Sequence, residues 1–260
     1  MLKAFFTSAT GMRAQELLID NTANNLANVN TTAFKRSHVE FADLLYDVSR
    51  VPGATTSEGQ SSPIGLQIGN GVRPVGTAIL WREGTEIQTG EQTHMRISGE
   101  GFFKVTMPDG SFAYTRDGSF HRDNNGLLVN AAGKPLEPNI IIPQDNSQIS
   151  ISNTGVVEVF QNGISTPVGT IQLVRFSNPS GLMHLGGNLY RDTTASGQEI
   201  LGNAGQPGFG TIQQGSLEGS NVEVVAEMVN LITAQRAYEI NSRAIRAGDE
   251  MLSSTSQLLR

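Results

Sequence analysis

The sequence is 260 residues long, which allows one or two domains with a substantial hydrophobic core. Its formal net charge is −6, and lysine and arginine form no basic cluster, so we expect no nucleic-acid partner. Cysteine is absent, which excludes disulfides, cysteine nucleophiles and thiolate metal sites. No apolar run approaches the about 18 residues of a membrane-spanning helix, so we expect no membrane insertion.

Residues 2–29 are expected to form a helix with an apolar stripe of seven-residue period. The stripe consists of Phe5, Met12, Ile19 and Leu26. Sustained heptads are typical of helices that pack in a coiled-coil-like manner. We therefore predict that these four side chains lie in a helical interface.

The same helix carries a second stripe, which is made of amides. Asn21, Asn24, Asn25 and Asn28 recur at i, i+3, i+4 and i+7 and so share one face. One interpretation is a solvated face, but such faces usually carry Glu and Lys, because Asn is a poorer helix former. Our hypothesis is that Asn24, Asn25 and Asn28 are wet in the monomer and bond neighbouring helices in an assembly.

Residues 36–71 are predicted to form a linker and an extended arm. The stretch from 47 to 71 is rich in Gly, Ser, Thr and Pro and offers few candidates for a core. The candidate arm residues are Pro52, Gly53, Ser57 and Pro63.

Residues 72–212 are expected to form a β-rich domain. Turn signals such as PDG at 108–110, DNNG at 123–126 and QNG at 161–163 separate short apolar or alternating runs. This is the pattern of a β-meander, whose edges a closed or sandwiched arrangement would protect. We predict that residues 213–219 are a return linker.

Residues 220–260 are expected to form a second heptad helix. Its apolar stripe consists of Val224, Leu231, Tyr238, Ile245, Leu252 and Leu259, and Gln235 and Asn241 are added as polar interface candidates. The predicted fold class is thus α+β: terminal helices (1–35 and 220–260) paired in a coiled-coil-like domain, with an inserted all-β domain and an arm. The helices either pack on the β-domain of their own chain or, since a two-helix hairpin is marginal alone, pack among copies.

The sequence contains no constellation that indicates a metal, a cofactor or a catalytic centre. Its histidines, His38, His94, His121 and His184, are spread over the chain without metal-ligand spacing. The stretch RDNNG at 122–126 lacks the acidic positions of a Ca²⁺ loop, and there is no G-x-S-x-G nucleophile elbow. We expect no cofactor and no enzymatic activity.

Two segments resemble the terminal signatures of the bacterial flagellar rod and hook proteins. They are NNLANVNTTAFKR at 24–36 and EMVNLITAQRAYEINSRAI at 227–245. SGEGFFKV at 98–105 and YTRDGSFHRDNNGLLVN at 114–130 are similar to the central β-segment of that family. The chain length, the arm and GLQIGNGVRP at 65–74 are most similar to the distal rod branch.

The resemblance implies a structural subunit that polymerises with copies of itself into the rod. It further implies contacts with other rod proteins, the hook protein and the outer bushing rings, a location in the periplasm, and passage through the flagellar export apparatus without a cleaved signal peptide. Residues 47–71 would reach neighbouring subunits.

One residue departs from the family pattern. The family usually has glycine where this chain has Ala33. Because a left-handed alanine costs about 1 kcal/mol or more, we expect Asn30 to adopt the left-handed conformation instead.

Two alternatives from other functional classes stay open at this point. One is a periplasmic or surface binding module whose β-domain holds a ligand, and the other is a cell-wall hydrolase. Rods in the electron microscope would indicate the polymer, and turnover of peptidoglycan would indicate the hydrolase.

Overall fold

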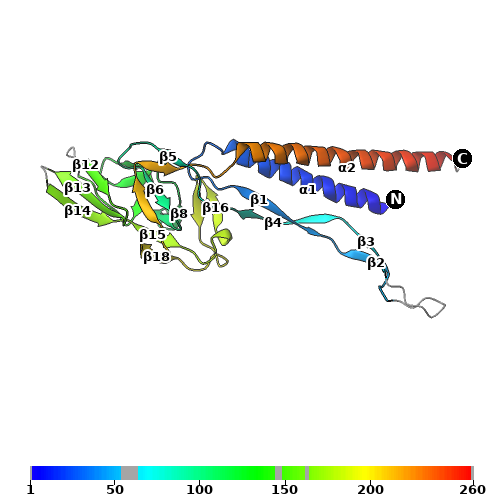
Figure 1. Ribbon diagram of the computed structural model, residues 1–260, viewed down its shortest axis with the longest axis horizontal. Coiled ribbons are helices and arrows are strands. Elements are labelled where there is room, and N and C mark those ends of the chain that lie inside the picture. Colours follow the sequence, from blue (N-terminus) through cyan, green and yellow to red (C-terminus); the bar gives the residue numbers. More distant parts are fainter. Residues whose placement is uncertain (1, 54–63, 144–147, 162–163, 259–260) are drawn as a thin grey trace. The chain divides into compact units, whose positions relative to one another are not determined.

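The computed structural model describes residues 2–53, 64–143, 148–161 and 164–258. Within them the fold is α+β, as predicted, with two α-helices and many short strands (Figure 1). The chain divides into two compact units. Unit 1 comprises 1–27, 37–78 and 223–260, and unit 2 comprises 28–36 and 79–222.

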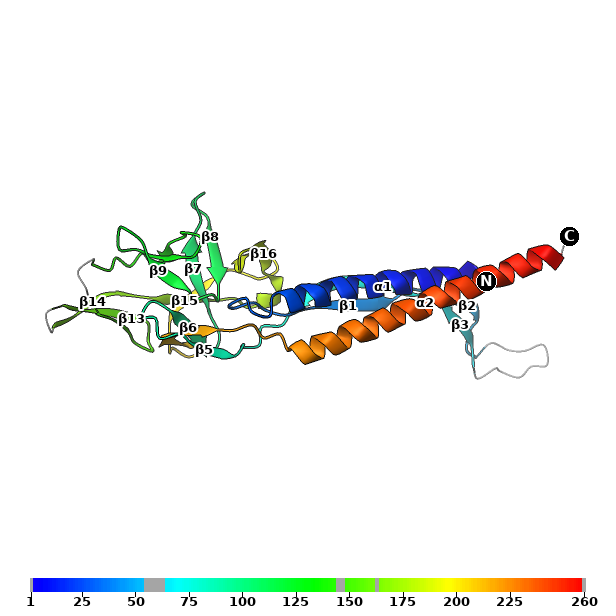
Figure 2. The same cartoon turned by 90° about the horizontal axis from the view of Figure 1, so that it is seen from above.

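Unit 1 is built on the two helices, α1 (Leu2–Ala27) and α2 (Val224–Leu258). They lie side by side in both views, and their chains run in opposite directions (Figures 1 and 2). Two small sheets complete the unit: strand β1 (Ser37–Asp43) pairs with β4 (Val72–Ile79), and β2 (Tyr46–Arg50) pairs with β3 (Leu66–Gly69). The arm is therefore a two-stranded ladder in its described part.

In its described residues, unit 2 is all-β apart from one short 3₁₀ turn. Its largest sheet has the order β16-β17-β8-β7-β15-β18, with β11 also paired to β7. The elements are β5 (Glu86–Gln88), β6 (Met95–Ser98), β7 (Phe102–Thr106), β8 (Phe112–Thr115), β9 (Phe120–Arg122), β10 (Leu128–Asn130), β11 (Leu136–Glu137), β12 (Gln148–Ile151), β13 (Val156–Gln161), β14 (Ile164–Thr170), β15 (Gln172–Arg175), η1 (Pro179–Gly181), β16 (Met183–Gly186), β17 (Leu189–Arg191), β18 (Ile200–Asn203), β19 (Thr211–Gln214) and β20 (Ser216–Glu218).

The hydrophobic core of the protein lies mainly in unit 2. Phe103 and Phe120 are fully buried there and meet edge to face at 5.4 Å between ring centroids. A second cluster gathers Phe102, Tyr114 and Tyr190 beside Trp81. The core of unit 2 thus joins strands that lie far apart in the sequence, among them β6, β7 and β19.

The predicted turns account for several hairpins. The PDG turn joins β7 to β8, with Gly110 at φ 80° and its N–H donating to the carbonyl of Met107. The DNNG turn joins β9 to β10, with Gly126 at φ 82°. Glycine adopts such positive φ without the steric cost of a Cβ. In the QNG turn, residues 162 and 163 lie outside the described part.

The units are bounded differently from the predicted domains. Residues 213–219 contain the second half of β19 and all of β20 and are not a linker, and residues 72–78 group with the helices and not with the β-unit. Segment 36–71 holds β1, β2 and β3. The composition of these stretches did not indicate strands, because β19 and β20 are only four and three residues long. They pair with β6 and β5, respectively.

The prediction for the turn after α1 was wrong. Ala33 itself adopts the left-handed conformation, at φ 55°. Its N–H donates to the carbonyl of Glu218 at 2.7 Å, and its side chain is buried. The hydrogen bond and the burial hold the residue in this conformation despite the steric cost.

Candidate assembly surface on the terminal helices

The two helices meet along a seam of small and amide residues. A Cβ built on Gly11 would lie 3.0 Å from the side-chain nitrogen of Asn241, and one built on Gly248 would lie 2.8 Å from the ring of Phe5. On α2 the seam runs through Glu227, Ala234, Asn241 and Gly248, which recur every seven residues. The close contacts set an antiparallel register of α1 against α2.

Asn25 is the polar centre of this seam. It is fully buried, its amide donates to the carbonyl of Ser37 at 2.8 Å, and its side-chain oxygen accepts from the N–H of Ser37 at 3.1 Å. The amide also lies 3.5 Å from a carboxylate oxygen of Glu227, which is itself buried. The first turn of α2 is a favourable place for that carboxylate, because the helix dipole is positive there.

Asn21 also forms hydrogen bonds with Ser37. Its amide donates to the carbonyl of Ser37 at 2.8 Å, and the hydroxyl of Ser37 donates to the Asn21 oxygen at 2.7 Å. The expectation that Asn25 is wet in the monomer was therefore wrong, because the amide is used to fix the start of β1 against α1. Asn24 is exposed and Asn28 is half-buried.

The other predicted interface residues divide by exposure. Among the described residues, the half-buried ones are Phe5, Met12, Ile19, Leu26, Leu231, Asn241 and Ile245, and the exposed ones are Val224, Gln235, Tyr238 and Leu252. Of the arm candidates, Pro52 and Gly53 are exposed, whereas Ser57 and Pro63 lie outside the described residues.

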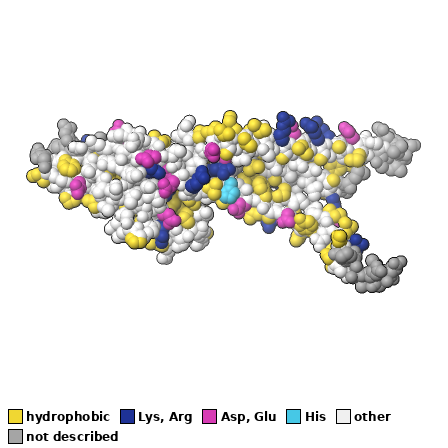
Figure 3. All heavy atoms as spheres, in the orientation of Figure 1, with side chains coloured by type: hydrophobic (Ala, Val, Ile, Leu, Met, Phe, Trp, Pro, Cys, Tyr) yellow, Lys and Arg dark blue, Asp and Glu magenta, His cyan; other side chains and the backbone are white. Residues whose placement is uncertain are grey.

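Large apolar side chains remain exposed on α2. Val225 is 70% exposed, Val229 56% and Ile232 55%. All three lie on the face of α2 opposite to the seam, which contains Glu227 and Ala234. Figure 3 shows hydrophobic side chains gathered over the first turns of α2, with Lys and Arg side chains farther along the helix. An exposed apolar stripe of this kind marks a contact surface.

A buried charge network lies in unit 2 and was missed by the sequence analysis. Lys35 and Glu218 form an ion pair, and the side chain of Arg116 donates to the second oxygen of Glu218 at 2.8 Å. Lys35 also donates to the carbonyl of Arg82 at 2.9 Å, and the N–H of Gly84 donates to Glu218 at 3.1 Å. Lys35 lies within the segment NNLANVNTTAFKR at 24–36, which resembles the N-terminal signature of the rod and hook proteins. That resemblance was the feature of the sequence that could have drawn attention to Lys35.

Burial and charge act in opposite directions on this network. Burial alone would raise the pKa of Glu218, but the charges of Arg116 and Lys35 outweigh it and hold the pKa below its ordinary value. Burial lowers the pKa of Lys35, and Glu218 opposes that effect only in part. The network joins the segment after α1 to the strand before α2 within unit 2.

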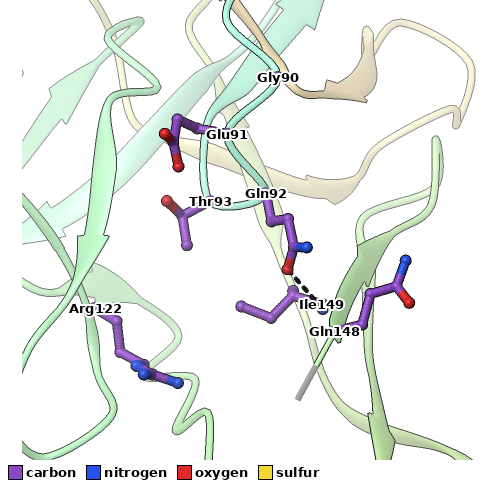
Figure 4. Close-up of a pocket in the computed structure, with 7 residues that line it drawn as sticks. All are labelled: Gly90, Glu91, Gln92, Thr93, Arg122, Gln148 and Ile149. Carbon is purple, nitrogen blue, oxygen red and sulfur yellow. Dashed lines mark hydrogen bonds between the residues drawn. The ribbon is translucent and has the colours of Figure 1, made fainter. Parts of the chain in front are cut away.

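A hollow in unit 2 is crossed by a hydrogen bond between two of its walls. It measures about 690 Å³ and is lined by Gly90, Glu91, Gln92, Thr93, Arg122, Gln148 and Ile149 (Figure 4). The oxygen of Gln92 accepts from the N–H of Ile149 at 3.1 Å, and so ties the loop before β6 to β12. Among the described residues there is no cluster of His, Asp and Glu suited to a metal ion.

Comparison with known proteins identifies the family. The model of the flagellar hook protein FlgE/F/G D1 domain matches residues 96–159, and that of the flagellar basal body rod FlgEFG protein C-terminal region matches residues 213–258. The flagellar basal-body rod protein FlgG of Borreliella burgdorferi is 44% identical over 264 residues, which cover all of both chains. The chain belongs to the FlgG family of flagellar basal-body rod proteins.

Other relatives agree with this assignment. FlgG of Buchnera aphidicola from Acyrthosiphon pisum is 46% identical over 260 residues, covering 99% of this chain and all of the relative. FlgG of Bacillus subtilis is 35% identical over 269 residues, which cover both chains completely. The FlgG family consists of structural rod proteins of the flagellar basal body and is not an enzyme family, and the predicted resemblance is confirmed.

Neither described helix is both long and apolar enough to cross a membrane.

Proposed function

We propose that this chain is a subunit of the distal rod that polymerises with copies of itself into a rigid helical tube and transmits torque from motor to hook. The observation that carries the proposal is the exposed apolar stripe of α2. Val225, Val229 and Ile232 follow the i, i+4, i+7 spacing of a helix that docks in a groove. A helix pair with such a stripe gains stability when further helices cover it.

The helices would supply the inner tube, and unit 2 an outer layer. The partners at the two ends would be other rod proteins and the hook protein, and the outer bushing rings would surround the shaft. The chain would reach the periplasm through the flagellar export apparatus without a cleaved signal peptide. A contact between unlike surfaces of successive copies extends into an open filament, which is the geometry that a rod requires.

The test is assembly of the purified full-length chain. We expect negative-stain electron microscopy of concentrated protein to show straight rods. The paired substitution Val229→Glu with Ile232→Glu places charges in the apolar stripe, and we expect it to leave only separate particles while the thermal unfolding of unit 2 is unchanged. Particles alone from the wild-type chain at every concentration would contradict the proposal.

A further inference from the structure

A groove of about 550 Å³ runs along α1, the other helix of unit 1. It lies between α1, the residue that follows β1 and the first residues of β4, and its lining includes Leu17, Leu44 and Val72. All three are half-buried, so the groove has an apolar floor that is only partly covered.

Four charged residues surround this floor, and they are arranged by sign. Glu16 and Asp20 lie toward the C-terminal end of the groove on α1. Arg13 and Arg73 lie toward the Thr10 end, because the N–H of Val72 donates to the hydroxyl of Thr10 at 3.4 Å. Within the described ranges none of these four side chains forms an ion pair or a hydrogen bond, so their charges are available to a partner.

The outward face of α2 has the complementary pattern. After its apolar anchors, Val225, Val229 and Ile232, the next outward residue is Arg236, whose side chain is 71% exposed. At 1.5 Å per residue, Val225 to Arg236 spans about 16 Å, and the groove from Thr10 to Asp20 spans about 15 Å. Three apolar anchors followed by one cation thus match an apolar floor that ends in two carboxylates.

We propose that the outward face of α2 of one copy docks in the α1 groove of a second copy, with Arg236 at Glu16 and Asp20 and the valines toward Thr10. This proposal rests on the proposed function and names the two surfaces that meet in the polymer. The surfaces are unlike, so each copy can offer one and receive the other. The charge arrangement also fixes direction, since the docked α2 must run parallel to the α1 that receives it.

The chain offers a matched pair of substitutions to test the contact. Arg236 and Arg243 both lie on the outward face, both approach Glu239, at 3.3 and 3.7 Å, and are 71% and 73% exposed. Arg243 lies seven residues beyond Arg236, about 10 Å past the end of the groove. We expect Arg236→Glu to raise the critical concentration for assembly about tenfold or more, and Arg243→Glu to leave it unchanged.

A mixing experiment distinguishes this contact from a general effect of charge. Glu16→Lys with Asp20→Lys should block assembly as Arg236→Glu does, because each variant brings like charges together. Mixed in equal amounts, the two variants can alternate, and every contact then joins opposite charges. We expect the mixture to assemble within about threefold of the wild-type concentration.

The outcomes separate the two proposals. If wild-type chain never polymerises, the proposed function fails. If it polymerises but Arg236→Glu and Arg243→Glu behave alike, or if the two blocked variants do not rescue each other, the groove receives another segment and the docking proposed here is wrong. Rescue in the mixture also demonstrates that both variants fold.

Discussion

At the residue scale, Asn25 is a buried polar side chain whose amide both donates and accepts hydrogen bonds. Asn25 exchanges hydrogen bonds with Ser37 and also approaches Glu227, so one amide joins both helices and the first strand of unit 1. A neutral amide can donate and accept at once, which a carboxylate cannot do. This explains why a poor helix former is tolerated in the middle of the seam.

Asn25→Asp should therefore damage the monomer as well as the polymer. The substitution removes the donor to the carbonyl of Ser37 and places a second carboxylate beside buried Glu227. We expect the helical part to lose about 2–4 kcal/mol of unfolding free energy at neutral pH, measured by far-ultraviolet circular dichroism in urea. Asn24→Asp, at an exposed position of the same helix, is the control and should change it little. Equal losses would contradict a special role for Asn25.

Acid should unfold unit 2 through Glu218. Because its folded pKa lies below the ordinary value of 4.5, its stabilising effect is complete above pH 4.5 and is lost as the pH falls through the folded pKa. Glu218→Gln should flatten this acid dependence in thermal melts, and at neutral pH it should cost about 3–5 kcal/mol, because Lys35 and Arg116 lose their counter-charge. Exposed Glu91→Gln is the control, and an unchanged acid profile for Glu218→Gln would refute the assignment.

At the scale of elements, the helix pair shows which heptad positions form the contact. The apolar stripe predicted on α2 leaves Val224 38%, Tyr238 41% and Leu252 39% exposed. The stripe three residues further along, with Ala234 and Gly248, contacts α1 instead. Small residues let two helix backbones approach closely, so the large apolar residues are left at the margins of the seam and outside it.

A disulfide can test the register, because the chain has no cysteine of its own. A Cβ on Gly11 lies 3.3 Å from the Cγ of Asn241, and the Sγ of a cysteine at 241 would take the place of that Cγ, so the two thiols come within reach of each other. We expect Gly11→Cys with Asn241→Cys to form an intramolecular bond in dilute, oxidised monomer, seen as a shift on a non-reducing gel. Gly11→Cys with Asn230→Cys displaces the second thiol by about 16 Å and should not. Cross-linking of both pairs would show that the helices slide.

At the scale of the whole molecule, the arm is largely exposed in its described part. Among the residues that the structure describes, strands β2 and β3 pair only with each other, and Leu45 is 88% and Leu66 53% exposed. A two-stranded ladder is marginal alone, and its open edges can pair with another chain. These features favour an arm that becomes stable against neighbouring subunits.

Removal of the arm should change the polymer and leave unit 2 unchanged. We expect deletion of residues 50–62 to preserve the thermal unfolding of unit 2 but to give a more flexible filament, because a bridge between subunits is lost. The measurement is the persistence length of filaments in electron micrographs. A Gly/Ser replacement of equal length should behave like the deletion, since it restores length without contacts. If the deletion variant formed rods as straight as those of wild type, the arm would be only a spacer and the prediction would be wrong.

The sequence by itself determined the family, the α+β class, the two terminal helices and several hairpin turns. Each depends on local information, such as the heptad repeat from Phe5 to Leu26 or the glycine of the PDG turn. Tertiary structure alone decided that Asn25 is buried, that Ala33 takes positive φ, and that Lys35 reaches Glu218. Periodicity identifies a face of an element but not its partner, because the partner is set by residues far away in the chain, whose hydrogen bonds and burial outweigh local preference.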